Sequence, residues 1–249
     1  MANATRLPLE VDMLGMIFNK KTPKIGSLRE LKILIFGGII SIVIAGSVLA
    51  YKPQATYRQN STSSYESFLT SVADMPFLGK AEAPITVIEF ADPLCPGAKS
   101  FFDIVESGLK TKYIETGLIR FYQWPTVINK VNTSINALEA MHCADDQDKY
   151  WQYRDYLLTI RPREDFWAVF TLDDYKQFAQ VLNLDTDKFN ACFDGGKYEK
   201  WIREIDSQRE RAGINSSPTL LVNNQILSFT AFDELDAAIE REIIKENGL

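Results

Sequence analysis

The sequence has little of the chemistry that metal sites and many hydrolases need. Its 249 residues include three cysteines and a single histidine, His142. One histidine among scattered cysteines does not give the ligand spacing of a zinc site, and the spacing supports no Ser–His–Asp arrangement. We therefore expect no metal and no cofactor, and we interpret His142 as a capping or packing residue in a helical region.

Basic charge is also scarce outside the N-terminal part of the chain. Residues 1–52 carry seven basic and three acidic side chains, whereas the other residues carry 20 basic and 30 acidic ones. An acidic body argues against nucleic acid as a partner, because phosphate binding needs a basic face. No internal repeat of fixed period is evident, which argues against a repeat architecture.

One long apolar run is present near the N-terminus. Residues 33–50 are 18 residues without a charge, and a helix of that length extends about 27 Å, close to the thickness of a bilayer's hydrocarbon core. Lys and Arg cluster on its N-terminal side, so the positive-inside rule places residues 1–32 in the cytoplasm. We predict a single transmembrane helix, an anchor in the cell membrane at 33–52, then a polar linker at 53–75 and an extracytoplasmic (periplasmic) domain at 76–249.

A cleaved signal peptide is the competing interpretation of this run. Val48 and Ala50 fit the small-residue pattern that precedes a cleavage site. However, the segment before the run would be some 32 residues long. The run is also longer than the roughly 7–15 apolar residues of a signal peptide. We therefore favour an uncleaved anchor.

The predicted domain begins with a strand, a helix and a second strand. Residues 84–91 are a β-branched run typical of a buried strand. Pro96 fits the first turn of a helix and Gly117 fits its C-terminal end. Residues 118–125 have the composition of a second strand that stops at a proline. This order predicts a βαβ unit.

Helical patterns with acidic loops continue up to about residue 212. The strand period returns at 216–229, where two apolar runs flank a pair of asparagines as in a β-hairpin. Residues 231–246 then have the pattern of an amphipathic helix. We predict an α/β domain with a small mixed sheet and a helical insertion at about 130–212.

The candidate chemistry lies between the first strand and its helix. A thiolate at a helix start meets unpaired backbone N–H groups and the positive end of the helix dipole, which stabilise the anion. Cys95 occupies this position and Pro96 follows it. The fourth position of a C-x-x-C motif is Ala98, which cannot supply the second thiol that exchange within such a motif needs.

Four segments in register resemble the DsbA-like thiol–disulfide oxidoreductases of the thioredoxin superfamily. They are GKAEAPITVIEFADPLCP, ALEAMHCADDQDKYWQYRDYLL, NLDTDKFNACFDGGKY and AGINSSPTLLVNNQIL. The resemblance implies a thioredoxin-like fold with an inserted helical domain, and it implies that Cys95 is the catalytic cysteine. It also implies that Pro218 is a cis-proline whose loop presents the backbone of Ser217 to an extended substrate. We expect Pro96, Ser217 and Pro218 to bind substrate.

The other two cysteines lie in the predicted insertion. Three cysteines outside a membrane suggest one disulfide and one remaining thiol. Cys143 and Cys192 are 49 positions apart, and the resembling family sometimes bridges these two regions. We predict a structural disulfide between them. The alternative is that one of them is a distant resolving partner for Cys95, and spacing does not decide between the two.

Two functions from different classes fit these observations. The first is thiol–disulfide exchange with an extracytoplasmic cysteine-containing protein or peptide, through a mixed disulfide of Cys95 alone. The second is a redox-inactive scaffold that binds an envelope protein or a membrane complex. The missing second cysteine favours the scaffold. Cys95 and the Ser217–Pro218 loop favour exchange, which is our hypothesis.

Overall fold

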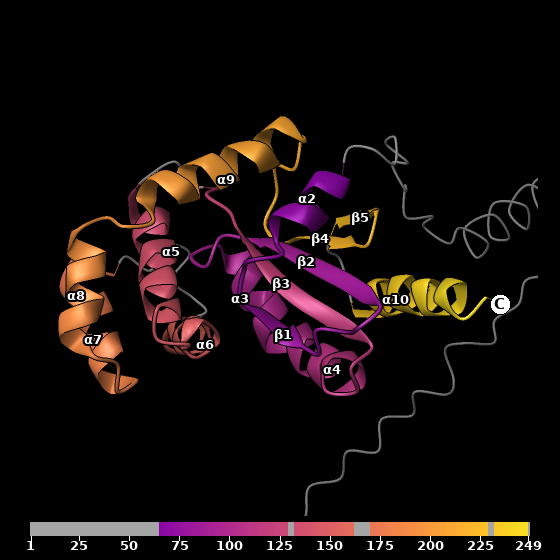
Figure 1. Ribbon diagram of the computed structural model, residues 1–249, viewed down its shortest axis with the longest axis horizontal. Coiled ribbons are helices and arrows are strands. Elements are labelled where there is room, and N and C mark those ends of the chain that lie inside the picture. Colours follow the sequence, from indigo (N-terminus) through magenta and orange to yellow (C-terminus); the bar gives the residue numbers. More distant parts are fainter. Residues whose placement is uncertain (1–64, 129–131, 162–169, 229–231, 249) are drawn as a thin grey trace, which may run out of the picture. The chain divides into compact units, whose positions relative to one another are not determined.

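The computed structural model describes residues 65–128, 132–161, 170–228 and 232–248 (Figure 1). The predicted cytoplasmic tail (1–32), the predicted anchor (33–52) and most of the predicted linker lie outside the described residues. None of the helices in the described ranges is both long and apolar enough to cross a membrane.

One mixed sheet forms the centre of the domain. Its strand order is β1-β3-β2-β4-β5, with β2 and β3 parallel and the other neighbours antiparallel. The strands are β1 (Phe77–Gly79), β2 (Ile85–Ala91), β3 (Ile119–Pro125), β4 (Thr219–Val222) and β5 (Gln225–Ser228). The predicted βαβ unit, hairpin and mixed sheet are therefore confirmed, whereas the three-residue β1 was not predicted.

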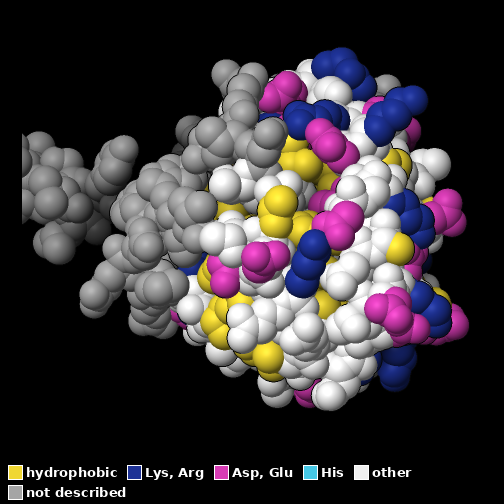
Figure 2. All heavy atoms as spheres, turned by 90° about the vertical axis from the view of Figure 1, so that its left-hand side faces the viewer, with side chains coloured by type: hydrophobic (Ala, Val, Ile, Leu, Met, Phe, Trp, Pro, Cys, Tyr) yellow, Lys and Arg dark blue, Asp and Glu magenta, His cyan; other side chains and the backbone are white. Residues whose placement is uncertain are grey.

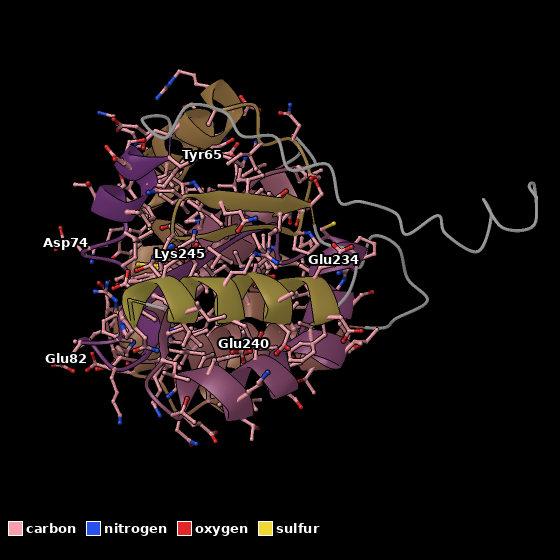
Figure 3. All side chains as sticks on the ribbon, turned by 90° about the vertical axis from the view of Figure 1, so that its right-hand side faces the viewer. Tyr65, Asp74, Glu82, Glu234, Glu240 and Lys245 are labelled. Carbon is pink, nitrogen blue, oxygen red and sulfur yellow. A yellow bond between two sulfur atoms is a disulfide. The ribbon has the colours of Figure 1, made fainter. Side chains whose placement is uncertain are left out.

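A long helix and the C-terminal helix cover one face of this sheet. The long helix runs without a break through α3 (Pro96–Phe101), η2 (Phe102–Glu106), α4 (Ser107–Leu109) and η3 (Lys110–Ile114). It ends near Gly117, whose φ of +80° suits glycine. Figure 3 shows the C-terminal helix α10 (Phe232–Glu246) in front, with Glu240 directed toward the long helix, where it accepts a hydrogen bond from Tyr113.

The opposite face of the sheet is covered by α2 (Glu66–Ser71) and α9 (Glu199–Arg211). Phe68 of α2 is buried, with its ring centroid 4.7 Å from that of Trp124 and 5.1 Å from that of Phe90. The prediction of a polar linker is thus wrong for residues 65–75. The reason is physical: the apolar side chains of this stretch fall on one helical face and pack on the sheet, and they are Tyr65, Phe68, Val72 and Met75.

Side chains alternate between the two faces along the central strand β2. Ile85 and Val87 pack with the long helix and α10, whereas Ile88 and Phe90 pack with α2 and α9. The whole strand is buried. It therefore ends at a fixed place between two packed layers, and the residues that follow it begin from a rigid support.

The helical insertion between β3 and β4 has a core of its own, on the left in Figure 1. Its helices are α5 (Asn132–Asp145), α6 (Tyr150–Ile160), α7 (Leu172–Val181), α8 (Thr186–Asp194) and α9. Thr171 and Asp174 form a reciprocal capping box at α7, and Asp185 caps α8. A disulfide joins Cys143 on α5 to Cys192 on α8. The predicted insertion is confirmed.

Candidate functional site

Cys95 is the residue immediately before α3, where β2 gives way to the long helix. Its backbone is extended, with φ −74° and ψ 133°, and its side chain is half-buried. The Cys95 N–H donates to Asp92 O at 2.9 Å, and Cys95 O accepts from the Lys99 N–H at 3.3 Å. The sulfur therefore lies beside the first turn of the helix, where backbone N–H groups lack helical acceptors.

The loop before β4 lies directly against this thiol. The peptide bond between Ser217 and Pro218 is cis. The Cys95 thiol donates to Ser217 O, with Sγ 3.3 Å from the oxygen. The structure thus brings together the four residues that the sequence assigned to catalysis and substrate binding, namely Cys95, Pro96, Ser217 and Pro218. Their roles remain predictions.

Gly97 lets the loop approach the helix this closely. A Cβ atom on Gly97 would lie 2.6 Å from Ser217 O and 2.8 Å from Pro218 Cδ, whereas ordinary contacts are 3.4–4 Å. Only a residue without a Cβ fits between the helix start and the loop. No local pattern in the sequence indicates a role for Gly97, because the atoms that it meets come from a segment 120 positions away.

Asp92 joins the segments that surround the thiol. It is fully buried, and its carboxylate accepts hydrogen bonds from the Leu94 N–H, the Ile128 N–H and the Ser134 hydroxyl at 2.8–3.0 Å. Its own N–H donates to Ser217 Oγ at 2.9 Å. One residue therefore connects the end of β2, the loop after β3 and the start of α5 through its carboxylate, and the cis-proline loop through its backbone N–H.

A buried arginine reaches the site from the insertion. Arg161 lies at the end of α6, and its Nη1 donates to Cys95 O at 2.8 Å. Only 3 % of its surface is exposed. The backbone of Cys95 is thereby held from both sides, by Asp92 in the loop and by Arg161 from the helical layer.

The sulfur chemistry available at this site is that of one thiol. All three cysteines of the chain lie in the described ranges, and Cys95 is the free one, because Cys143 and Cys192 are bonded to each other. Ala98, at the fourth position of the motif, is buried one turn inside the helix. In this state of the molecule, neither remaining cysteine offers a resolving thiol to Cys95.

A buried acid lies on the strand that leads to the site. Glu89 of β2 is 3 % exposed. Burial raises its pKa to about 8, and the positive charge of Arg154 opposes this rise only in part. Arg154 is itself fully buried and hydrogen-bonded to Glu106 and Asp155. The signal that could have revealed Glu89 is a single acidic residue inside an otherwise apolar strand.

His142 has a structural position. It is buried, and its ring packs against Tyr150, Tyr198 and Trp201 at centroid distances of 4.7–5.4 Å. Burial lowers its pKa to about 3, so the imidazole is neutral at physiological pH. The interpretation of His142 as a packing residue of the helical region fits these contacts.

Comparisons with known proteins agree with this architecture. A family model described as Thioredoxin matches residues 71–241. The disulfide bond formation protein D of Bacillus subtilis is 25 % identical over 177 residues, which cover 70 % of this chain and 79 % of that protein.

Solved structures show the same fold. The oxidised BdbD of Bacillus subtilis superposes with a TM-score of 0.60 at 24 % identity, over 67 % of this chain and 91 % of that one. DsbA of Chlamydia trachomatis superposes with a TM-score of 0.59 at 19 % identity, over 68 % and 91 %. At these identities the structural matches establish the fold and leave the chemistry to be argued from the site.

Proposed function

Because the chain belongs to the thioredoxin family and resembles its DsbA-like members, we propose that it is a thiol–disulfide exchange protein that acts through Cys95 alone. One observation carries the proposal: the free, half-buried Cys95 sulfur lies 3.3 Å from the carbonyl of Ser217 in a cis-proline loop. The free thiol and the loop therefore lie together, as the proposal requires, although the second cysteine of the motif is absent.

The exchange is a pair of balanced sulfur displacements. The Cys95 thiolate attacks one sulfur of a substrate disulfide, a mixed disulfide forms, and the other substrate sulfur leaves as a thiolate. A second thiol, from the substrate or from a small thiol, then attacks the substrate sulfur of the mixed disulfide and releases Cys95. No electrons are gained or lost overall, so the reaction is disulfide reshuffling or transfer rather than net oxidation.

The loop supplies the substrate contact in this scheme. An extended peptide can pair with the exposed backbone of Ser217, as strands add to a sheet edge. Pro96 follows Cys95 and Pro218 follows Ser217, so each proline restricts the backbone beside this contact. The substrate is then an extracytoplasmic protein or peptide with a cysteine in an extended segment.

Membrane anchoring is the second part of the proposal. The uncharged run at 33–50, with basic residues before it, supports a single-pass anchor that leaves the thioredoxin-like domain outside the cytoplasm. Alkaline extraction of membranes tests it: the full chain should remain with the membrane, and a chain that lacks residues 1–52 should be released. Release of the full chain would contradict the anchor.

Mixed-disulfide formation tests the chemistry. The detergent-solubilised full chain is incubated with a peptide disulfide, and the adduct is located by mass spectrometry. We expect an adduct at Cys95 that forms about tenfold faster than in the urea-unfolded chain, because the folded loop aligns the peptide beside the sulfur and a tenfold gain needs only about 1.4 kcal/mol. The variant Cys95→Ser should form none.

The alternative, a redox-inactive scaffold, makes the opposite prediction. It is favoured by Ala98, since the helix start holds one thiol only. A folded chain whose Cys95 reacts no faster than the unfolded chain would refute the exchange function and leave the scaffold.

A further inference from the structure

A carboxylate lies against the disulfide of the helical insertion. Glu139 and Cys143 are one turn apart on α5, and Cys192 is on α8. Glu139 Oε1 is 3.7 Å from Cys143 Sγ. The ligating atoms of the three residues all lie within 4.8 Å of one another, and all three side chains are buried.

The hydrogen bonds that Glu139 accepts do not by themselves explain why its carboxylate lies against the disulfide. Both of its oxygens share the N–H of Tyr198, at 2.8 and 3.1 Å. The contact with Cys143 is not a hydrogen bond, because a disulfide sulfur has no proton to donate. Glu139 is only 3 % exposed, and a buried carboxylate is costly unless neighbouring donors or charges compensate it. A cation beside the sulfurs would compensate it.

Two thiolates and a carboxylate are a ligand set that suits zinc. Thiolate ligands select soft or borderline ions such as Zn²⁺ over Ca²⁺ and Mg²⁺. Zn–S bonds of roughly 2.3 Å in a tetrahedron place two sulfurs about 3.8 Å apart. The Cα atoms of Cys143 and Cys192 are 5.8 Å apart. Once the disulfide is opened, rotation of the two side chains can therefore separate the sulfurs while the helices stay in place.

A pocket that is open to solvent borders this cluster at Glu139. It has a volume of about 210 Å³, and its lining includes Glu139, Asp194 and Glu199. Its walls come from α5, the starts of α7 and α9, and the end of α8. Figure 2 looks onto the side of the molecule that carries α8, where acidic and basic side chains are interspersed. An acidic lining favours entry of a cation.

We propose that reduction of the Cys143–Cys192 disulfide creates a zinc site with Cys143, Cys192 and Glu139 as ligands and a fourth position open to the pocket. A dithiol supplies the two electrons: the S–S bond breaks, the dithiol becomes a disulfide, and its protons pass to the two cysteines. Zn²⁺ binding then releases the thiol protons. The site does not depend on Cys95 or on its exchange chemistry.

Cobalt binding to the reduced chain tests the proposal. The full chain with Cys95→Ser is reduced with a phosphine, exchanged into detergent buffer under argon and titrated with Co²⁺, which Zn²⁺ then displaces. We expect one Co²⁺ per chain, with the visible bands of a tetrahedral ion and thiolate charge-transfer absorption. The oxidised chain should bind none.

Variants distinguish the site from adventitious thiol binding. In Cys143→Ser and Cys192→Ser the charge-transfer absorption should fall by half or more. Glu139→Gln should weaken binding by about tenfold or more, because it removes a direct ligand. Glu204→Gln, a change at an exposed residue of α9 outside both the ligand set and the pocket lining, is the matched control and should leave the affinity unchanged.

Thermal unfolding tests zinc binding even if reduction of the disulfide loosens the packing of the helical insertion. Zn²⁺ should raise the Tm of the reduced chain and leave that of the oxidised chain unchanged, because ligands that bind the folded state stabilise it. The proposal is overturned if the reduced chain binds no stoichiometric Co²⁺, if Glu139→Gln binds as tightly as the parent, or if Zn²⁺ does not raise the Tm.

Discussion

Gly97→Ala would separate the helix start from the cis-proline loop. The added Cβ would lie 2.6 Å from Ser217 O and 2.8 Å from Pro218 Cδ, so the loop must retreat by several tenths of an ångström or more. Such overpacking costs about 1–3 kcal/mol. The gain in helix propensity from glycine to alanine, about 0.5–1 kcal/mol, offsets part of it. We expect a net loss of about 1–2 kcal/mol in the free energy of unfolding.

The effect on reactivity should exceed the effect on stability. When the loop retreats, the contact of 3.3 Å between Cys95 Sγ and Ser217 O is lost, and a bound peptide is no longer aligned with the sulfur. We expect the rate of mixed-disulfide formation with a peptide disulfide to fall about tenfold, which corresponds to roughly 1.4 kcal/mol. The rate with a small aromatic disulfide, which needs no loop contact, should change less than threefold.

Gly108→Ala is the matched control for this experiment. It lies in the same helix, and its Cβ would meet only the ring of Phe232, at 3.2 Å, which can move. Its stability and both rates should stay near those of the parent chain. Two results would contradict this prediction. Gly97→Ala could react with the peptide disulfide as fast as Gly108→Ala does, or its rates with the peptide disulfide and with the small aromatic disulfide could fall equally.

Three further predictions concern the surroundings of the thiol. Asp92→Asn keeps the shape of the side chain but places an amide N–H₂ group against a buried N–H donor. Urea unfolding should therefore show a loss of about 2 kcal/mol or more in the free energy of unfolding. A loss under about 0.5 kcal/mol, usual for surface changes, would contradict the hydrogen-bond assignment. Glu89 has a pKa of about 8 in the folded chain and 4.5 as its reference value, so its contribution is fully present below pH 4.5 and is lost as the pH rises through 8. The free energy of unfolding of the parent should therefore fall between pH 5 and pH 8, and in Glu89→Gln this fall should be smaller by up to about 4 kcal/mol. An equal fall in both chains would count against the raised pKa. Ala98→Cys completes the motif, so mild oxidation should remove the free thiol of Cys95, as measured by thiol titration; a thiol that stays free would show that position 98 does not face the sulfur.

The local order of elements was predictable from the sequence because it depends on local patterns. The β-branched run at residues 84–91, the prolines and glycines at element ends and the amphipathic C-terminal run are all signals within short stretches of the chain. Phe68, Val72 and Met75 also recur at helical spacing, and this stripe could have predicted α2. The polar residues around it led to the interpretation as a linker.

The inner structure of the site was not predictable in the same way. Asp92 and Gly97 acquire their roles from contacts with residues about 120 positions further along the chain. Such contacts depend on how the insertion returns the chain to the sheet, which no local pattern encodes. Glu89 is similar, since its raised pKa results from burial by layers that are distant in sequence. The sequence could therefore point to Cys95 as the candidate nucleophile, and the fold was needed to identify what holds this residue.

Because the helical insertion separates Cys95 from Ser217 in the sequence, the site can form only late in synthesis. Cys95 and Ser217 are 122 positions apart, on either side of the helical insertion. At 5–20 residues per second, roughly 6–24 s of synthesis separate the thiol from its loop. A chain still being made thus presents a lone cysteine without its cis-proline loop. Both cysteines of the structural disulfide also emerge before Ser217 does. Cys143 and Cys192 can therefore meet while Cys95 is chemically available but not yet enclosed, so a wrong disulfide to Cys95 is the error that the maturing chain has to avoid.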